Sequence, residues 1–481
     1  MWNSFDYNNL FSILIDITIW ITIFNIIFVV IMENRNPVKT IAWVIVLLFL
    51  PYIGFILYIF FGRNVRNKRI ISSSNYQQVT RRISEQMQHS TITECDERSL
   101  HLMKLFQGNN ESIPFPHNNI EIYTTGSDKR NALFQEIEKA RHHIHLQYYI
   151  FNDDKLGNAL SDLLIRKAHE GIMVRIIYDD VACWKVKGSF YERLKEEGIE
   201  VRSFLKVRYP LFTDKINYRN HRKLVVIDGK VGFIGGMNIA DRYVEGVEWG
   251  VWRDTHLKIT GQAVYGLQAS FLSDWYFVNR TVLSSRDYFP PIAPVKSAST
   301  DIVQIVTSAP NAKWNNIEQG LLTAIAGAEN YIYIQTPYFL PSESIIRAMQ
   351  LGALAQVDIR LMLSERSDLS IIDHASRSYL TELIDAGVKV YFYQKGFLHS
   401  KAIVWDDKYA TVGSTNMDFR SFEQNFEINA FIYGCDTARK LKAAFLSDLQ
   451  SAQLIRMKEW KKRPKLDKLK ESLCRILSPL F

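Results

Sequence analysis

Two short segments of this sequence repeat one pattern of residues that could do chemistry. Each reads His-x-Lys, four further residues and Asp, and the two copies comprise His221, Lys223 and Asp228, then His399, Lys401 and Asp406. In both copies a glycine follows the histidine by 14 residues and an asparagine by 17; these are Gly235 and Asn238, then Gly413 and Asn416. The copies lie 178 residues apart in the same register, which indicates an internal repeat.

Paired histidines and lysines suit attack on a phosphodiester. Imidazole titrates near neutral pH, so one histidine can attack phosphorus while the other protonates the departing alkoxide and later deprotonates the incoming alcohol. Neither half holds a complete set of these groups, so we expect the halves to pack face to face around one phosphate. Lysine and asparagine side chains can hold its charged oxygens, and the predicted phosphate-binding residues are Lys223, Lys401, Asn238 and Asn416.

We expect neither a metal nor a cofactor. Two ammonium groups can supply the electrostatic help that other phosphotransferases take from metal ions. The sequence contains no clustered acidic metal motif and no P-loop.

Four acidic residues accompany the repeated pattern. Asp228 and Asp406 end the strand that carries each His-Lys pair and are expected to act as supporting anchors in the catalytic motif. Asp254 follows His221 by 33 residues, and Glu427 follows His399 by 28. A carboxylate on the far ring nitrogen would fix the tautomer and stabilise the imidazolium, so we predict that Asp254 and Glu427 orient the histidines. The alternative is that both form strand-end salt bridges.

The overall composition points to an anionic partner. The chain of 481 residues has a net charge of +8 and a pI near 9.0, which fits either nucleic acid or an acidic membrane surface. Its 47% hydrophobic and 13% aromatic residues exclude a disordered protein. The four cysteines form no Cys-x-x-Cys pair, which favours reduced thiols over a disulfide scaffold or zinc site.

Two apolar stretches precede the rest of the chain. Residues 10–32 and 41–61 are each long enough, as helices, to cross a hydrocarbon core of about 30 Å. We predict a transmembrane hairpin over residues 1–62; the alternative, a cleaved signal peptide before a buried helix, lacks the usual basic start. Arg63, Arg66, Lys68 and Arg69 follow the second stretch, which predicts a cytoplasmic body. Asp16 and Asn25 should face a helix or a headgroup.

The rest of the sequence predicts two successive copies of an α/β fold. Strands expected at 120–123, 143–150, 174–178 and 199–204 alternate with helices, and strands at 331–335, 357–361 and 388–393 repeat the order. Such alternation implies mixed or parallel sheets covered by helices on both faces. We place the domains at 1–62 (hairpin), 63–116 (connector), 117–290 and 300–455 (two α/β/α sandwiches) and 456–481 (tail).

In its two His-x-Lys…Asp units the chain resembles the phospholipase D superfamily, whose HKD motif has this pattern. Within it the resemblance is strongest to the bacterial cardiolipin synthases. It rests on further segments spread over nearly the whole chain: Asn36 to Trp43, Pro51 to Gly54, Trp252 to His256, Gly396 to Lys401, Asn416 to Ser421 and Glu471 to Arg475. One departure is Val181-Ala182-Cys183, where the family more usually shows Gly-Ser.

The resemblance implies two tandem phospholipase D-like domains in a bacterial cell membrane and transfer of a phosphatidyl group between two phosphatidylglycerol molecules. Cardiolipin and glycerol would be the products, through a phosphatidyl-histidine on His221, with the reverse assignment of the two histidines left open. Anionic lipid rather than nucleic acid would be the partner, and a homo-oligomer is left open. The rivals are a phospholipase D or nuclease that uses water as acceptor, and a membrane scaffold without activity.

The end of the chain fits a membrane enzyme. Residues 456–481 carry nine basic and three acidic residues. An apolar stripe accompanies them: Leu466, Leu469, Leu473, Leu477 and Leu480. Such a helix can lie on anionic lipid, whereas the alternative is a solvated basic tail interrupted at Pro464.

Overall fold

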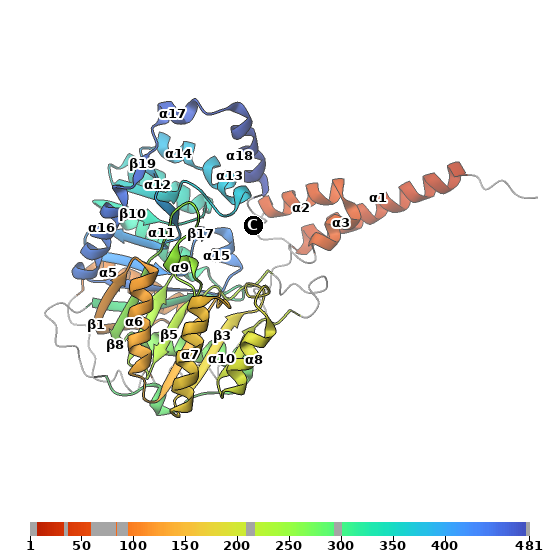
Figure 1. Cartoon of the computed structure of the whole chain (residues 1–481). Coiled ribbons are helices and arrows are strands. Elements are labelled where there is room, and N and C mark those ends of the chain that lie inside the picture. Colours follow the sequence, from red (N-terminus) through yellow and green to blue (C-terminus); the bar gives the residue numbers. More distant parts are fainter. Residues whose placement is uncertain are drawn as a thin grey trace, which may run out of the picture.

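A computed structural model describes residues 7–32, 37–58, 83, 95–207, 217–292 and 301–477. Its centre is one mixed sheet of fifteen strands, in the order β4-β3-β2-β5-β6-β8-β1-β9-β18-β16-β15-β10-β12-β13-β19 (Figure 1). The two halves of the chain meet where β1 pairs antiparallel with β9, so they share one sheet. The expected mixed α/β fold with tandem halves is therefore confirmed.

The strands of the two halves correspond in order. The first half supplies β1 (Pro114–Tyr123), β2 (His143–Tyr148), β3 (Met173–Asp179), β4 (Glu200–Phe204), β5 (Leu224–Ile227), β6 (Val231–Gly235) and β8 (His256–Gly261). The second supplies β9 (Asp301–Ser308), β10 (Tyr331–Gln335), β12 (Asp358–Ser364), β13 (Lys389–Tyr393), β15 (Ala402–Trp405), β16 (Tyr409–Gly413) and β18 (Glu427–Tyr433), with β19 (Ala452–Leu454) added at its edge.

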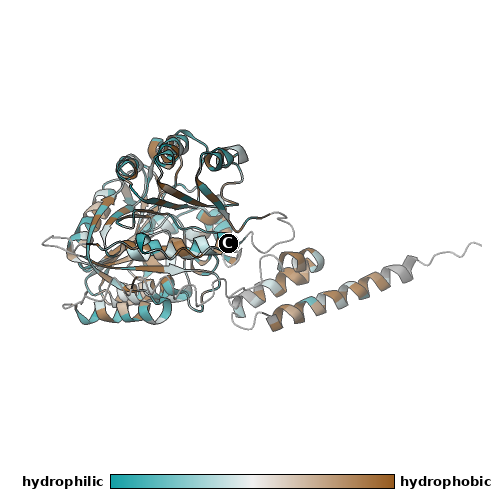
Figure 2. Ribbon diagram, turned by 90° about the horizontal axis from the view of Figure 1, so that it is seen from below, coloured by the Kyte–Doolittle hydropathy of each residue, from teal (hydrophilic) through white to brown (hydrophobic). Residues whose placement is uncertain are grey.

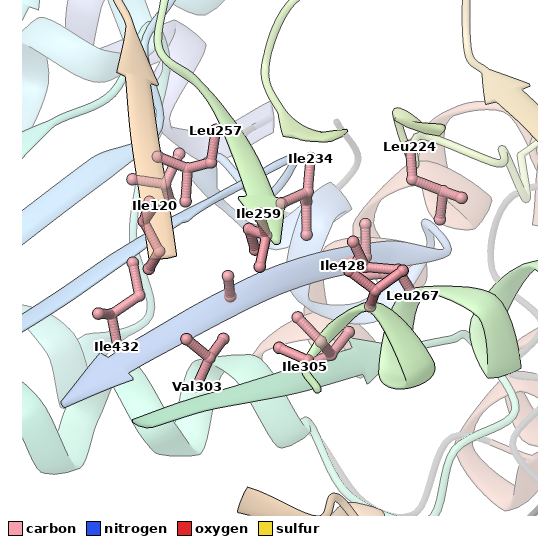
Figure 3. Close-up of a cluster of buried hydrophobic side chains, with 14 of the residues drawn as sticks. Ile120, Leu224, Ile234, Leu257, Ile259, Leu267, Val303, Ile305, Ile428 and Ile432 are labelled. Atoms are coloured by element: carbon pink, nitrogen blue, oxygen red, sulfur yellow. The ribbon is translucent and has the colours of Figure 1, made fainter. Parts of the chain in front are cut away.

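Strands that are buried on both faces explain the continuous apolar runs in the sequence. In β5, Leu224 and Val226 face one layer while Val225 and Ile227 face the other. The first layer is a core common to both halves, in which Ile259 lies near Ile305 and Ile428 (Figure 3). Helices α10 (Val264–Asn279) and α16 (Cys435–Leu449) cover this side.

The opposite face carries a separate set of helices for each half. These are α6 (Gly126–Glu138), α7 (Lys155–His169) and α8 (Gly188–Glu196) in the first half, and α11 (Asn316–Gly327), α12 (Glu343–Leu354), α13 (Ser370–Ser378) and α14 (Leu380–Asp385) in the second. Side-chain caps fix several of their starts: Thr125 accepts from Asp128 N, and Asp154 accepts from Gly157 N.

Part of the stretch expected as a connector is built into the body. Helix α5 (Glu97–Asn110) buries Leu102, Met103 and Phe106 in the core of the second half. Its Asn110 side chain donates to Thr307 O at 2.9 Å. Residues 97–110 therefore belong structurally to the half that follows later in the chain. The basic residues 63–69 and most of the interval between the two expected domains, residues 291–299, lie outside the described residues.

The first apolar stretch forms one long helix, α1 (Tyr7–Met32), within which Ser12–Ile31 is long and apolar enough to cross a membrane. The second stretch is divided: α2 (Pro37–Phe49) ends before Leu50, and α3 (Pro51–Leu57) follows. Pro51 lacks an N–H and pushes the preceding residue out of the helical region, and Leu50 has φ −134° and ψ 65°. Thirteen residues of α2 span only about 20 Å. Within the described residues a single helix thus has membrane-spanning length.

The three N-terminal helices pack on one another and project from the body, and Figure 2 shows them brown along most of their length. Asn25 is buried and donates to Pro51 O at 3.1 Å, as expected for a polar residue that faces another helix. Asp16 is exposed.

Candidate active site

Short backbone pairings between the halves position both histidines. His221 precedes β5, and its N–H donates to Phe426 O at 2.9 Å. In the same way His399 precedes β15, and its N–H donates to Arg253 O at 2.7 Å. The second pairing continues as a small parallel sheet between β7 (Val251–Arg253) and β14 (Gly396–Leu398). Each histidine is thereby bonded to the half of the chain that does not contain it.

The orienting carboxylates reach the histidines across the two halves. His221 Nδ1 lies 2.9 Å from Glu427 Oε1, and His399 Nδ1 lies 2.6 Å from Asp254 Oδ2. Counting along the sequence had associated Asp254 with His221 and Glu427 with His399, and that association is wrong. The cause is the backbone pairing, because Phe426 and Arg253 bond to the opposite histidines and Glu427 and Asp254 are the next residues. Since Nδ1 faces a carboxylate, Nε2 is left for phosphorus in both rings.

The two carboxylates have unequal support. Glu427 accepts from Ser414 Oγ and from Asn425 Nδ2, the latter at 3.2 Å. Burial alone would raise the pKa of Glu427, but the His221 ring, Lys223 and Ser414 hold it below its usual value. Asp254 accepts the Thr255 N–H at 2.7 Å. Burial raises the pKa of Asp254 to about 6, although Lys401 and the Thr255 N–H oppose this.

Both lysines are buried beside the histidines. Lys223 Nζ donates to His221 O at 2.5 Å, and Lys401 Nζ lies 2.9 Å from His399 Nδ1 and also bonds to His399 O. Burial lowers the pKa of Lys401 to about 8, with Asp254 and Glu427 acting in the opposite direction. Burial also places the pKa of Lys223 well below its ordinary value. An arriving anion would stabilise the charged form of both groups.

The histidines belong to one electrostatic unit. Burial lowers the pKa of His221 to about 4, and the Lys223 and Lys401 ammonium groups contribute. Burial, Lys401 and Lys223 likewise keep the pKa of His399 well below 6.5. Each half's lysine therefore acts on the other half's histidine, as expected for a single shared site. At neutral pH both rings are neutral, so either can supply a lone pair to phosphorus.

The two asparagines are placed differently. Asn238 Oδ1 accepts from Ile150 N at 3.1 Å, and its Nδ2 donates to Tyr243 OH at 2.7 Å. Asn416 is buried, and its Oδ1 has no partner among the described residues. A phosphate oxygen needs a donor, which in asparagine is Nδ2. Asn238 Nδ2 already donates to Tyr243 OH, whereas no described residue accepts from Asn416 Nδ2, so Asn416 is the better candidate for holding phosphate.

The aspartates of the two motifs lie at the far ends of β5 and β15, away from the rings. Asp228 accepts the N–H groups of Arg141, His142 and His143. Asp406 accepts those of the three residues that lead into β10: Glu329, Asn330 and Tyr331. Their contacts are those of the anchors expected from their positions, and neither is in contact with its motif's histidine. They hold the start of the neighbouring strand in place.

Aromatic rings around the imidazoles were not identified as site residues from the sequence. The Tyr149 ring lies 4.8 Å from that of His221, and Lys223 Nζ is 5.1 Å from the Tyr149 ring centre. Trp252 and Phe397 lie 5.4 and 5.7 Å from His399. The one sequence signal for the role of Tyr149 is its position just after β2, at the edge where the site forms.

Comparisons with known proteins agree with this geometry. The family described as "Cardiolipin synthase, PLD-like domain" matches residues 133–275 and 321–449, and "Phospholipase_D-nuclease N-terminal" matches 17–63. A cardiolipin synthase of Geobacillus sp. (strain WCH70) is 41% identical over 95% of this chain and 91% of its own length. The chain belongs to the cardiolipin synthase family.

Other comparisons extend the family assignment. "Cardiolipin synthase 2" of Bacillus anthracis is also 41% identical, over 94% of this chain and 89% of that protein. Among solved structures, the phosphatidylserine synthase of Haemophilus influenzae Rd KW20 matches with a TM-score of 0.62 at 14% identity, over 79% of this chain and all of that one. That likeness concerns the fold. The family matches therefore cover both repeated domains and also the N-terminal segment that precedes them.

Proposed function

We propose that this chain is a cardiolipin synthase, a phosphatidyltransferase that joins two phosphatidylglycerol molecules. The observation that carries the proposal is the pair of crossed histidine–carboxylate contacts, His221 with Glu427 and His399 with Asp254. They leave both Nε2 atoms free of a carboxylate, which supports the joint action of the two rings on a single phosphate. The family membership identifies the phosphate as that of a phospholipid.

The first step breaks one phosphodiester bond. His221 Nε2 attacks phosphorus, the bond from phosphorus to the glycerol oxygen breaks, and His399 gives its Nε2 proton to that oxygen. His399 is neutral in the free site, and the incoming phosphate favours its protonation because it offsets the nearby ammonium charges. Lys223 and Lys401 hold the charged oxygens, together with Asn416.

The second step re-forms a phosphodiester. His399, now neutral, takes the proton from a glycerol hydroxyl of a second phosphatidylglycerol. That oxygen attacks phosphorus, the phosphorus–nitrogen bond to His221 breaks, and cardiolipin is released. One ester replaces another, so the reaction needs no nucleotide. We assign attack to His221 because its carboxylate, Glu427, also accepts from Ser414 and Asn425 and has a pKa below its usual value, so it stays charged beside the ring.

We further propose that the enzyme is held in the bacterial cell membrane with its body in the cytoplasm. The membrane-length helix α1 supports the anchor. The basic residues after the second apolar stretch, Arg63, Arg66, Lys68 and Arg69, support the cytoplasmic side. In this proposal α2 and α3 belong to the return span of the hairpin.

A single assay tests the reaction. The purified chain in detergent is incubated with phosphatidylglycerol that carries separate labels in its acyl chains and headgroup glycerol. We expect cardiolipin and free glycerol in equal amounts. Phosphatidic acid as the main product would show that the enzyme is a hydrolytic phospholipase D. Absence of turnover would favour a membrane scaffold without activity.

Two histidine variants and a control test the site. His221→Ala and His399→Ala should each lower turnover by a factor on the order of 10²–10⁴. His169→Ala is the control, because His169 is an exposed residue paired with Glu197. Transfer at the unchanged rate in either active-site variant would show that the assignment is wrong.

A further inference from the structure

Two exposed apolar residues occupy equivalent places in the two halves. Gln147 pairs with Ile177 between β2 and β3, and Gln335 pairs with Met362 between β10 and β12, which sets the halves in register. In that register Trp184 corresponds to Leu369, each five residues beyond the last residue of its strand. Trp184 is 49% exposed and Leu369 is 48% exposed. Large apolar side chains presented to solvent at matched positions call for a partner.

Both residues are tied to the active site by their neighbours. Asp179, the last residue of β3, accepts the Asn220 N–H at 2.8 Å, beside His221, and the next residue, Asp180, accepts from Trp184 Nε1 at 3.3 Å. Asp368, which precedes Leu369, accepts from Tyr338 OH at 2.6 Å, and its charge acts on Lys401. Trp184 and Leu369 therefore lie at the carboxyl-end edge of the sheet, the same edge at which His221 and His399 lie.

More apolar surface continues from Leu369. Ile371 in α13 is 52% exposed. Helix α18 (Lys465–Leu477) packs on α13 and exposes one apolar stripe, which comprises Leu466, Leu469, Leu473 and Ile476. Arg475 fixes α18 in this place, since it pairs with Glu382 at 2.8 Å and lies 4.3 Å over the Tyr379 ring. The predicted tail thus includes an ordered helix whose apolar stripe faces solvent.

Basic side chains lie on this surface beside Asp180 and Asp368. Lys185 and Lys187 are exposed beside Trp184, and Arg366 is exposed near Leu369. Tryptophan and lysine together are typical of the boundary between lipid headgroups and acyl chains. Figure 1 shows α13, α18 and α8 on the side of the body from which α1 projects. A bilayer that receives α1 would meet this side.

We propose that Trp184, Leu369, Ile371 and the α18 stripe form a docking face that seats the active-site edge of the sheet on an anionic bilayer. This inference rests on the proposed function, and it adds the membrane surface to which the enzyme binds. Trp184 of the first half and Leu369 of the second lie at the same edge of the sheet as the site, so a phosphatidylglycerol headgroup would reach His221 and His399 from the bilayer without crossing open water. The lysines and Arg366 bind the anionic headgroups.

The kinetic test compares bilayer substrate with monomeric substrate. The full chain is reconstituted in nanodiscs that contain long-chain phosphatidylglycerol, and separately assayed in detergent with dihexanoyl-phosphatidylglycerol. For Trp184→Asp with Leu369→Asp we expect kcat/KM to fall about 10-fold or more on the bilayer substrate, from the lost burial of the two side chains. On the short-chain substrate the change should stay within about twofold, which also shows that the variant folds.

A matched control comes from the opposite edge of the sheet. Leu354 is 65% exposed near the end of α12, just before β12 begins, and Leu354→Asp should leave both rates unchanged. Equal losses on the two substrates, or no loss on the bilayer, would overturn the proposal. Wild-type chain that makes no cardiolipin from either substrate would instead contradict the proposed function.

A second measurement does not depend on activity. Trp184→Cys, Leu369→Cys and Leu354→Cys are labelled with nitrobenzoxadiazole in a Cys435→Ser background, because Cys435 is exposed. In nanodiscs that contain doxyl-labelled lipid, the first two labels should be quenched and the third should not. Absence of quenching at positions 184 and 369 would overturn the proposal, as would their cross-linking to a second copy of the chain.

Discussion

At the scale of single residues, two histidines with the same sequence context have unequal partners. Glu427 receives a hydroxyl and an amide in addition to His221, whereas the buried Asp254 receives a backbone N–H in addition to His399. The firmly charged Glu427 favours a fixed ring that attacks phosphorus. The less stabilised charge of Asp254 suits a ring that exchanges a proton twice per cycle. Two similar motifs can therefore supply different catalytic groups: one supplies the nucleophile and the other the acid–base catalyst.

The crossed pairing predicts which carboxylate serves which histidine. With phosphatidyl-p-nitrophenol the leaving group needs little protonation, so release of the first nitrophenol depends mainly on the nucleophile. Glu427→Gln should abolish this burst, because it deprives His221 of its orienting charge. Asp254→Asn should retain the burst but slow steady-state turnover on phosphatidylglycerol by a factor on the order of 10²–10⁴. Stopped-flow absorbance measures both phases. The opposite pattern would mean that His399 is the nucleophile.

At the scale of elements, the motif aspartates support strands. Asp406 is at φ 53°, a left-handed conformation that aspartate and asparagine tolerate, and its side chain gathers the three N–H groups at the start of β10. Arg98 from α5 adds an ion pair at 3.2 Å. This bond joins the segment before the first half to the second motif. Asp228 makes the same backbone contacts at the start of β2.

We therefore expect Asp406→Asn to affect stability more than chemistry. Asparagine keeps the backbone conformation but loses the charge that strengthens these bonds, which should lower the free energy of unfolding by about 1–3 kcal/mol. Thermal unfolding in detergent measures this, and kcat of the folded fraction should stay within about twofold. Asp407→Asn is the matched control, because Asp407 has φ 54° but its half-buried carboxylate bonds to the Lys442 and Tyr331 side chains rather than to backbone N–H groups, and it should change stability by less than about 1 kcal/mol. Lost turnover at an unchanged unfolding temperature would place Asp406 in the chemistry.

At the scale of the whole molecule, sequence periodicity predicted the repeat and most strands. Apolar runs such as Leu224–Ile227 are local signals, and so is the repeated motif. The crossed pairing of carboxylates and histidines could not be predicted from the sequence. It depends on the contacts of Phe426 with His221 and of Arg253 with His399, which join residues 205 and 146 positions apart. The break at Pro51 was visible in the sequence, yet the apolar run through it predicted one continuous span. The packing of α5 on the second half likewise depends on contacts distant in sequence.

A shared sheet and a shared site predict that the halves work only together. Expressed alone, residues 1–292 would expose β1 and residues 301–481 would expose β9, and each unpaired edge favours aggregation. Each fragment would also lack the carboxylate that orients its histidine. Co-expression of the two fragments should restore pairing of β1 with β9 and cardiolipin formation from phosphatidylglycerol, measured by thin-layer chromatography of membranes. Asp254→Asn in the first fragment should then slow the turnover that depends on His399 of the second. Activity of either fragment alone would contradict the composite site.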